Sequence, residues 1–179
     1  MLVVAATSFE LDLIEGAETL CCGIGPVEAA LQTSRAIATQ RPTAILHIGI
    51  AGAHDLGPPT IVLGSASVYC DLVDPAFTLP RVERVEPDTG LLALAAAALP
   101  GAHVLPIATT ARVGGGACCR VEAMEGFGVL RAAALAGVPA VELRAISNLV
   151  DDDRSQWRIA AALEALAAAA SNVIEAFHG

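Results

Sequence analysis

The sequence predicts an α/β protein, built as a three-layer α/β/α sandwich around a mixed, mostly parallel central sheet. Short apolar runs of strand length alternate with Ala- and Leu-rich segments of helical period, in the order β, β, α, β, β, α, β, α, β, α. A chain of 179 residues is long enough to bury a core of its own. Neither an internal repeat nor an interdomain linker interrupts the pattern, so we expect residues 1–179 to form a single domain.

The first half of the chain predicts four strands and one helix. The expected strands cover residues 2–6, 19–22, 43–50 and 60–69, which are apolar runs of strand length. Gly23 and Gly25 form a tight turn, and Pro26 suits the first position of a helix that runs to about Gln40. A dinucleotide-binding loop would need glycine where Glu28 stands. A carboxylate there would repel a pyrophosphate, so that loop is excluded.

The second half predicts three helices and two strands. The expected helices cover residues 89–99, 122–136 and a last segment from Ser155 or Gln156 onward, and the expected strands cover residues 102–108 and 140–146. Asp88 or Thr89 suits the N-terminus of the first of these helices. Gly137 suits the C-terminus of the second, because glycine takes the left-handed conformation found there. Apolar residues repeat at three- and four-residue steps along the last helix, which is ordinary core packing.

Charge and hydropathy limit the partners of the protein. The net charge of −9, with no Lys and ten scattered Arg, argues against nucleic acid. Every apolar run is interrupted by Gly, Pro or charge before it reaches membrane-spanning length, and the apolar N-terminus lacks basic residues before it. We therefore expect no membrane association and a cytoplasmic location. The 55% hydrophobic content and mean hydropathy of +0.62 exceed the needs of a small monomer, which predicts a homodimer or larger homo-oligomer.

The cysteines and histidines predict neither a metal site nor a cofactor. The five cysteines are Cys21, Cys22, Cys70, Cys118 and Cys119. Adjacent cysteines rarely bridge to each other, and an odd number in such a chain favours free thiols. Neither C-x-x-C nor H-x-x-x-H spacing occurs, so no zinc site is expected. The four isolated histidines receive no role, and the acidic run at 151–153 is expected to be a solvated loop rather than a magnesium site.

The most informative stretch runs from Val121 to Trp157. Its strand carries Glu142 and Arg144 among apolar residues, and charges in a protein interior need partners. Arg144 could pair with Glu142 or with Glu122. The strand ends in Ser147 and Asn148. Polar side chains at the carboxyl end of a strand are where α/β folds bind ligands, so this end predicts the functional site.

Two motifs in this stretch carry a resemblance. Met124-Glu125-Gly126, followed by Arg144-Ala145-Ile146-Ser147, resembles the signature half of the purine nucleoside phosphorylase and nucleosidase superfamily. Within it, the patterns E-x-M-E-G and R-x-I-S-N, with Trp157 nine residues after Asn148, look most like the futalosine hydrolase family. Enzymes of that family release hypoxanthine from futalosine in a menaquinone pathway. Relatives that cleave methylthioadenosine and adenosylhomocysteine carry Asp where this chain has Asn148.

The resemblance implies roles for individual residues. Glu10, just after the first strand, would be the general base that activates the attacking water; its plainer interpretation is an acid in the first turn of a helix. Asn148 would hydrogen-bond the leaving base around N7. Glu125 would bind the ribose hydroxyls and Met124 would pack on the sugar. The turn at Ile50, Ala51 and Gly52 would lie against the ribose and the water. Ser147 and Arg144 would orient Asn148 and the carboxylates.

Other functions fit the same residues. The chain could be a methylthioadenosine/adenosylhomocysteine nucleosidase or a purine nucleoside phosphorylase on the same scaffold, or a non-catalytic nucleoside-binding protein. It is shorter than typical members of the resembling family, in the segments 71–88 and 109–121. In the second of these segments the family has a loop that lines the base pocket. The sequence therefore leaves open the substituent at C5′, the lining of the base pocket, the size of the oligomer, the role of the cysteines and the rate.

Overall fold

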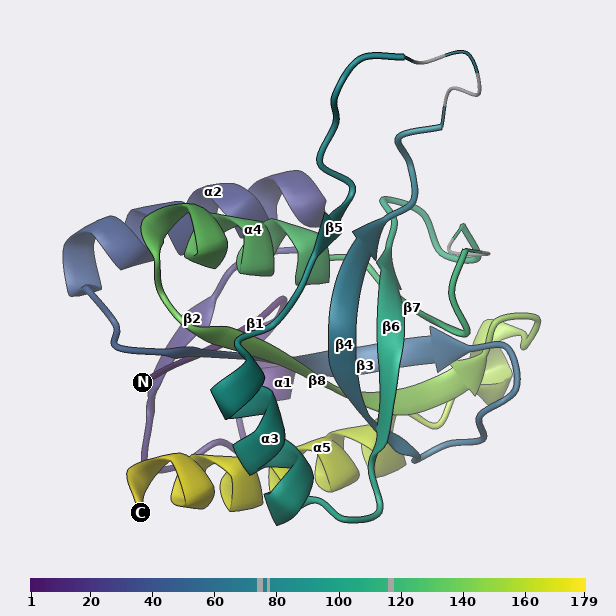
Figure 1. Cartoon of the computed structure of the whole chain (residues 1–179). Helices are drawn as coiled ribbons and strands as arrows, with labels where there is room; N and C mark the ends of the chain where they lie inside the picture. Colours follow the sequence, from purple (N-terminus) through teal and green to yellow (C-terminus); the bar gives the residue numbers. More distant parts are fainter. Residues whose placement is uncertain (74–75, 77, 116–117) are drawn as a thin grey trace.

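Figure 1 shows the computed structural model, which describes residues 1–73, 76, 78–115 and 118–179. The strands are β1 (Leu2–Ala5), β2 (Glu18–Cys21), β3 (Ile45–Ala53), β4 (Ile61–Tyr69), β5 (Arg84–Val85), β6 (His103–Thr109), β7 (Val121–Ala123) and β8 (Ala140–Leu149). The helices are α1 (Ser8–Leu11), α2 (Pro26–Gln40), α3 (Thr89–Ala98), α4 (Gly126–Ala136), α5 (Ile159–His178) and a 3₁₀ turn, η1 (Arg154–Gln156).

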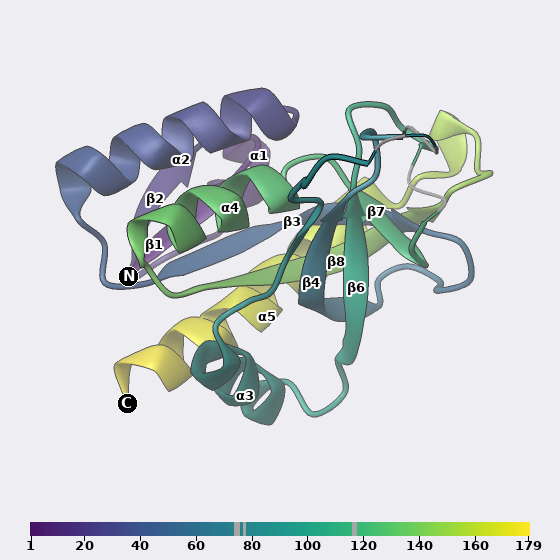
Figure 2. The ribbon, with the colours of Figure 1, turned by 45° about the horizontal axis from the view of Figure 1, so that its top comes forward.

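In the part of the chain that the structure describes, eight strands form one mixed sheet, and five of them close into a ring. β3 pairs with β8, β8 with β4, β4 with β6, β6 with β7, and β7 returns to β3. β1 and β2 extend the ring beyond β3, and β5 extends it beyond β4. Helices α2 and α4 cover one face of the sheet, and α3 and α5 cover the other (Figures 1 and 2). The predicted three-layer α/β/α fold with a mixed sheet is therefore confirmed, and the closure of the sheet is an addition to it.

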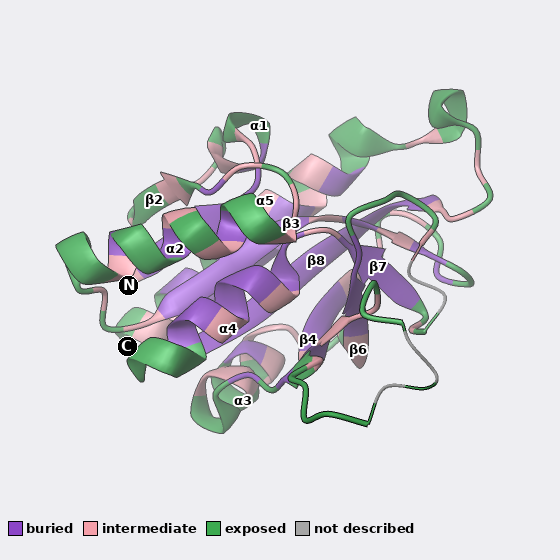
Figure 3. Ribbon diagram, turned by 90° about the horizontal axis from the view of Figure 1, so that it is seen from above, coloured by how far each residue is buried: buried purple, intermediate pink, exposed green. Residues whose placement is uncertain are grey.

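The alternation of side chains along each strand divides the core between the two faces. In β1, Val3 and Ala5 pack on the α3 and α5 side, and Leu2 and Val4 pack on the α2 and α4 side. This is the two-residue period of a strand whose two faces are both covered. Figure 3 shows the same result from above: β8 and most of β3 are buried along their length. The central strands can therefore carry charged side chains only where other protein groups satisfy them.

Local start and stop signals are confirmed at three helix ends. Pro26 is the first residue of α2. The side chain of Asp88 accepts a hydrogen bond from the backbone N–H of Leu91 at 2.9 Å and so caps α3. Gly137 ends α4 with a φ of 69°, a left-handed conformation that glycine adopts without steric cost.

The prediction for residues 122–136 is wrong at its start. Residues 121–123 form strand β7, and helix α4 begins only at Gly126. The Ala- and Leu-rich composition suited a helix, but pairing of β7 with β3 and β6 overrides that preference over three residues. The strand expected at 140–146 continues to Leu149, so Ser147 and Asn148 lie within β8 rather than beyond it.

By length and composition, α5 is a helix that could cross a membrane. In this fold its apolar stripe packs on the sheet instead. The buried residues of the stripe are Ala162, Leu166, Ala169, Ala170, Val173 and Ile174. Its apolar character is therefore that of a helix covering one face of a core.

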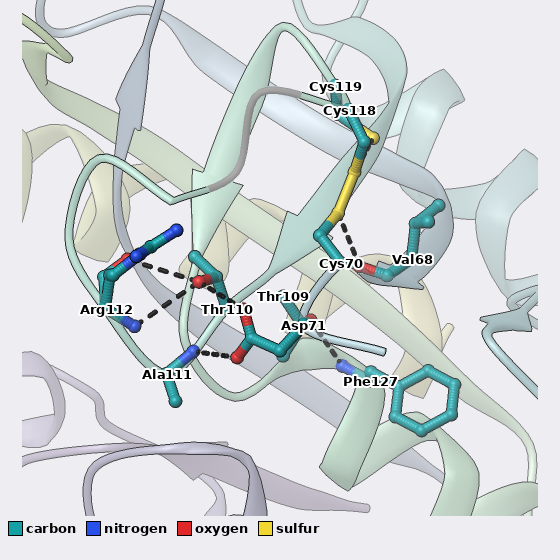
Figure 4. Close-up of a disulfide and its surroundings, with 10 residues drawn as sticks. All are labelled: Val68, Cys70, Asp71, Thr109, Thr110, Ala111, Arg112, Cys118, Cys119 and Phe127. Atoms are coloured by element: carbon teal, nitrogen blue, oxygen red, sulfur yellow. Dashed lines mark hydrogen bonds between the residues drawn. A yellow bond between two sulfur atoms is a disulfide. The ribbon is translucent and has the colours of Figure 1, made fainter. Parts of the chain in front are cut away.

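The prediction that all thiols are free is wrong for one pair. Cys70, just after β4, and Cys118, in the connection between β6 and β7, form a disulfide across 48 residues (Figure 4). Asp71 joins the same two segments, because its carboxylate accepts hydrogen bonds from Thr110 Oγ1 at 2.8 Å and from the backbone N–H of Ala111 at 2.6 Å. Cys21, Cys22 and Cys119 are free thiols.

Candidate functional site

Glu10 is a buried carboxylate held by three hydrogen bonds. It lies in the single turn of α1, which the chain enters directly after β1. One oxygen, Oε2, accepts from the backbone N–H of Thr7 at 3.0 Å and from its hydroxyl at 2.9 Å. The other, Oε1, accepts from the backbone N–H of Ile50 in β3 at 3.1 Å. The first strand end and the middle of the sheet thus fix Glu10 between them.

Glu125 approaches the same place from the N-terminal end of α4. It stands directly before α4, and its Oε1 accepts the backbone N–H of Gly25, in the turn before α2, at 3.0 Å. Burial raises the pKa of this carboxyl, and the negative charges of Glu10 and Glu142 act in the same direction. The guanidinium of Arg144 and the hydrogen bond from Gly25 oppose that rise.

Arg144 lies between these two carboxylates. Its Nη2 is 3.9 Å from Oε2 of Glu125, and its Nε donates to Oε1 of Glu142 at 2.9 Å. The side chain is 1% exposed, so the ion pairs are screened very little by water. Burial disfavours its charge, yet the carboxylates of Glu142, Glu125 and Glu10 outweigh that effect and raise the pKa of the guanidinium.

His47 completes this group, which we call the arginine cluster: Glu10, His47, Glu125, Glu142 and Arg144. The ring nitrogen Nδ1 lies 3.0 Å from the carbonyl oxygen of Val4, which can only accept, so Nδ1 carries the proton. Nε2 then accepts from Nη2 of Arg144. Complete burial, together with the charge of Arg144, lowers the pKa of His47 well below its ordinary value of 6.5. The imidazole is therefore neutral and in one tautomer.

A second group, the asparagine cluster, consists of Ala51, Gly52, Ser147 and Asn148 at the far end of β8. The hydroxyl of Ser147 donates to Oδ1 of Asn148 at 2.8 Å and lies 3.2 Å from the carbonyl oxygen of Ala51. Nδ2 of Asn148 donates to the carbonyl oxygen of Leu149 at 2.8 Å. A carbonyl oxygen can only accept, so the amide atom beside it must be the nitrogen Nδ2 and not the oxygen Oδ1. This fixes the orientation of the Asn148 amide. For the second N–H of Nδ2, no partner is found among the described residues.

The two clusters are spaced along one strand. Arg144 and Asn148 are four residues apart in β8, which corresponds to about 13 Å between their Cα atoms. β3 runs beside β8 in parallel and contributes His47 to one cluster and Gly52 to the other, with a register shift between Ala51 and Gly52. A group of charges at one end and a directed amide at the other suit a ligand with a polyhydroxy part and a hydrogen-bonding base.

The sequence-predicted residues are distributed as follows. Glu10, Glu125 and Arg144 meet in the arginine cluster, where Ile50 contributes its backbone N–H to Glu10. Ala51, Gly52, Ser147 and Asn148 meet in the asparagine cluster. Met124 lies half-buried directly before Glu125. Arg144 pairs with Glu142 and not with Glu122, whose Oε1 instead accepts the backbone N–H of Gly114 at 2.7 Å.

Sequence reasoning missed His47, and it treated Glu142 only as a partner for Arg144. The available signal was their position: each is a titratable residue inside an apolar strand, and such residues are buried only with partners. Nearby pockets do not identify the site. One of about 300 Å³ opens beside the disulfide, and one of about 240 Å³ lies at the C-terminal end of α4. Within the described residues, no group of three or more His, Cys, Asp and Glu is placed to hold a metal ion.

Comparisons with known proteins identify the family of the chain. The family model described as the phosphorylase superfamily matches residues 19–121. A futalosine hydrolase of Streptomyces coelicolor is 33% identical over 180 residues, which cover 86% of this chain and 77% of that protein.

Two solved structures extend the comparison to the fold. A futalosine hydrolase of Helicobacter pylori superimposes with a TM-score of 0.84 at 19% identity, over 97% of this chain and 96% of that one. A 5′-methylthioadenosine/S-adenosylhomocysteine nucleosidase of Neisseria meningitidis, in complex with methylthio-immucillin-A, has a TM-score of 0.84 at 20% identity and 97% coverage of both chains. At these identities the likeness concerns the fold.

Proposed function

The chain belongs to the phosphorylase superfamily, and from this membership we propose that it hydrolyses the N-ribosyl bond of futalosine and releases hypoxanthine, as a step of menaquinone biosynthesis. The observation that carries the proposal is the 33% identity to a futalosine hydrolase across 86% of the chain. The arginine and asparagine clusters supply groups of the kind that this reaction needs.

The reaction makes three demands. The sugar passes through an oxocarbenium-like state, water must lose a proton as it attacks C1′, and the purine must leave with its negative charge stabilised. Glu10 is the proposed general base. Glu125 is the proposed acceptor for the ribose hydroxyls, and charge-assisted hydrogen bonds of this kind are stronger than neutral ones. The positive charge of Arg144 between them lets two carboxylates stand close together.

Asn148 is the proposed contact for the leaving base, with Ser147 orienting its amide. Because Ser147 occupies Oδ1, the available N–H of Nδ2 is directed as a donor. Like an oxyanion-hole donor, a neutral amide donates a hydrogen bond to the charge that develops on the purine. It does not supply a proton. A 6-oxopurine suits such a site, because its O6 shares the negative charge.

A second candidate is an adenine-releasing nucleosidase or a phosphorylase on the same scaffold. The fold is compatible with both, since the solved nucleosidases superimpose as well as the futalosine hydrolases do. Asn148 favours the 6-oxopurine over adenine. A non-catalytic nucleoside-binding protein is disfavoured, because binding alone does not require both Glu10 and Glu125 to be buried beside Arg144, and burying such charges is costly.

We further propose that residues 1–179 act as one domain, in the cytoplasm, and assemble as a homodimer or larger homo-oligomer. Support for assembly comes from exposed apolar side chains on α1, the turn that follows it, the turn before α2 and the first half of α2. These are Phe9, Leu13, Ile24, Val27 and Leu31, which we call the α2 patch. Patches of this kind on a small chain mark interaction surfaces.

The test is product analysis with purified protein. Futalosine, inosine and methylthioadenosine are incubated separately, with and without phosphate, and the free base is measured. We expect hypoxanthine from futalosine, independent of phosphate. Release of adenine from methylthioadenosine as the main activity would replace the proposal by the nucleosidase, and a requirement for phosphate would replace it by the phosphorylase.

A matched pair of variants tests the general base. Glu10→Gln is expected to fold normally and to lose about 10²- to 10⁴-fold in kcat, because a positioned base contributes that much. Glu15→Gln changes an exposed glutamate a few residues on and is expected to retain the rate. A wild-type rate in Glu10→Gln would remove Glu10 from the mechanism.

A further inference from the structure

Glu142 is a charged residue that the proposed chemistry does not use, although it lies at the centre of the molecule. It is fully buried in β8, two residues before Arg144 and on the same face of the strand. Oε1 accepts from Nε of Arg144 at 2.9 Å, and Oε2 accepts from the hydroxyl of Ser67 in β4. Burial of a carboxylate is costly even when it is paired, so a pair retained here calls for a reason.

The surrounding backbone leaves room for this pair. A Cβ on Gly126, the first residue of α4, would overlap both carboxylate oxygens of Glu142. A Cβ on Gly49 would overlap Nη1 of Arg144 and stand 2.9 Å from Oε1 of Glu10. The guanidinium and the carboxylate of Glu10 therefore meet over Gly49. Two glycines, on different elements, keep the space in which Arg144 reaches the site.

His47 holds the guanidinium from the neighbouring strand. In the parallel pairing of β3 and β8, His47 lies beside Glu142 and Gly49 lies beside Arg144. Glu142 binds Nε of the guanidinium and His47 binds Nη2. Two fixed contacts at different nitrogens of a planar group determine its orientation.

We propose that Glu142 and His47 are positioning residues of the reaction, which fix the guanidinium of Arg144 between Glu10 and Glu125 and divide its positive charge between them. The inference rests on the proposed function for its kinetic part. Neither residue touches the substrate; each acts through Arg144. Ser67 supports Glu142 in the same way.

The charges around Arg144 explain why Glu142 matters. Facing it are Glu10 from α1, Glu125 before α4, Glu142 from β8 itself, His47 from β3 and Cys22 after β2. His47 is neutral, and burial raises the pKa of Cys22 to about 12, so the thiol is also neutral. Three carboxylates therefore share one cation. Removing the charge of Glu142 leaves more of that cation for Glu125, and the pKa of Glu125 should fall.

Two variants of Glu142 separate the effect of its charge from the effect of its side-chain length. Glu142→Gln keeps the shape and removes the charge. We expect it to lower the pKa of Glu125, to move the acid limb of the kcat/KM profile to lower pH, and to reduce kcat about 10- to 100-fold through misplacement of Arg144. Glu142→Asp keeps the charge on a side chain one methylene shorter. It should leave the acid limb in place and still reduce kcat.

The control is Asp55→Asn. Asp55 pairs with Nε of Arg120 at 3.0 Å, a geometry like that of Glu142 with Arg144, but on the surface. It should change neither kcat nor the acid limb. The pKa of Glu125 is read directly by carbon-13 NMR titration of the labelled carboxyl, assigned with Glu125→Gln. This titration needs no substrate, so it reports on Glu142 even if futalosine is not cleaved.

Wild-type kcat and an unmoved Glu125 titration in Glu142→Gln would overturn the proposal. If that variant does not fold, Ser67→Ala and His47→Gln take its place. Each should lower kcat and leave KM nearly unchanged, and a wild-type kcat in both would equally overturn it. If the wild type does not cleave futalosine but the Glu125 titration shifts as expected in Glu142→Gln, the proposed substrate is rejected. The role of Glu142 in positioning Arg144 is then kept.

Discussion

At the scale of single residues, Asn148 is the position that we propose decides which base is recognised. Asn148→Ala should cost about 2–4 kcal/mol of transition-state stabilisation, as loss of a preorganised donor does. Asn148→Asp should shift the preference toward a 6-amino purine, because a protonated Asp can give a proton to N7. The measurement is the ratio of kcat/KM for futalosine and its 6-amino analogue.

The control for this prediction is Asn172→Asp, the same exchange at an exposed position of α5. It should leave the ratio unchanged. If Asn148→Asp also leaves the ratio unchanged, Asn148 does not read the base, and the 6-oxopurine assignment loses its support at this residue.

His47 links stability to pH. In the folded protein its pKa is well below 6.5, whereas in the unfolded chain it returns to about that value. Below about pH 6.5 the unfolded chain therefore binds a proton that the folded protein excludes. The contribution of His47 to the free energy of unfolding should fall with decreasing pH, by up to about 1.4 kcal/mol per pH unit.

Urea unfolding at several pH values checks this slope. His47→Gln keeps an acceptor for Arg144 but cannot titrate, so its unfolding free energy should depend less on pH than that of the wild type. His54→Gln, at an exposed histidine, should behave like the wild type. Equal slopes in His47→Gln and wild type would contradict the prediction.

The sequence predicts some of these residues and not others, for a physical reason. Glu142 and Arg144 are two apart in a strand, so their shared face follows from the period alone. The partners across the sheet do not: His47 is 97 residues from Arg144, and Ser67 is 75 residues from Glu142. The roles of His47 and Ser67 depend on which strands are neighbours, and local pattern does not contain that information.

At the scale of elements, helices α2 and α4 pack closely against each other at Gly128 and Pro26. A Cβ on Gly128 would collide with the carbonyl oxygen of Pro26, which is backbone and cannot move aside cheaply. Gly128→Ala should therefore lower the free energy of unfolding by about 1–3 kcal/mol, the usual cost of overpacking. Gly57→Ala, where no atom lies within 4 Å of the new Cβ, is the control. Thermal melts that do not differ would exclude this contact as a constraint.

Element boundaries follow the same division between local and distant causes. Helix ends at Pro26, Asp88 and Gly137 obey local rules and are predicted correctly. Strand β7 is not predicted, because three residues are too few for a period and its partners in β3 and β6 are distant in the chain. The disulfide has the same origin, since Cys70 and Cys118 meet only because β4 pairs with β6.

At the scale of the whole molecule, the α2 patch predicts self-association. Light scattering at micromolar concentration should give a dimer or a larger even-numbered oligomer. Leu31→Arg, in the patch, should shift the distribution toward monomer, because it places a charge in an apolar interface. Leu94→Arg changes an exposed leucine on α3, which covers the opposite face of the sheet, and should not (Figure 2). A wild-type monomer would contradict the prediction.

The closed ring of strands has a consequence for how the protein opens. Each of the five ring strands is hydrogen-bonded on both sides, so none can detach without breaking two ladders at once. Among the described strands, β2 pairs with β1 alone and β5 with β4 alone. Backbone amides of β2 and β5 should therefore exchange with deuterium first, and those of β3 and β8 last, in a single global event. The amides of β8, the strand that carries both Arg144 and Asn148, would then be among the slowest in the molecule to exchange.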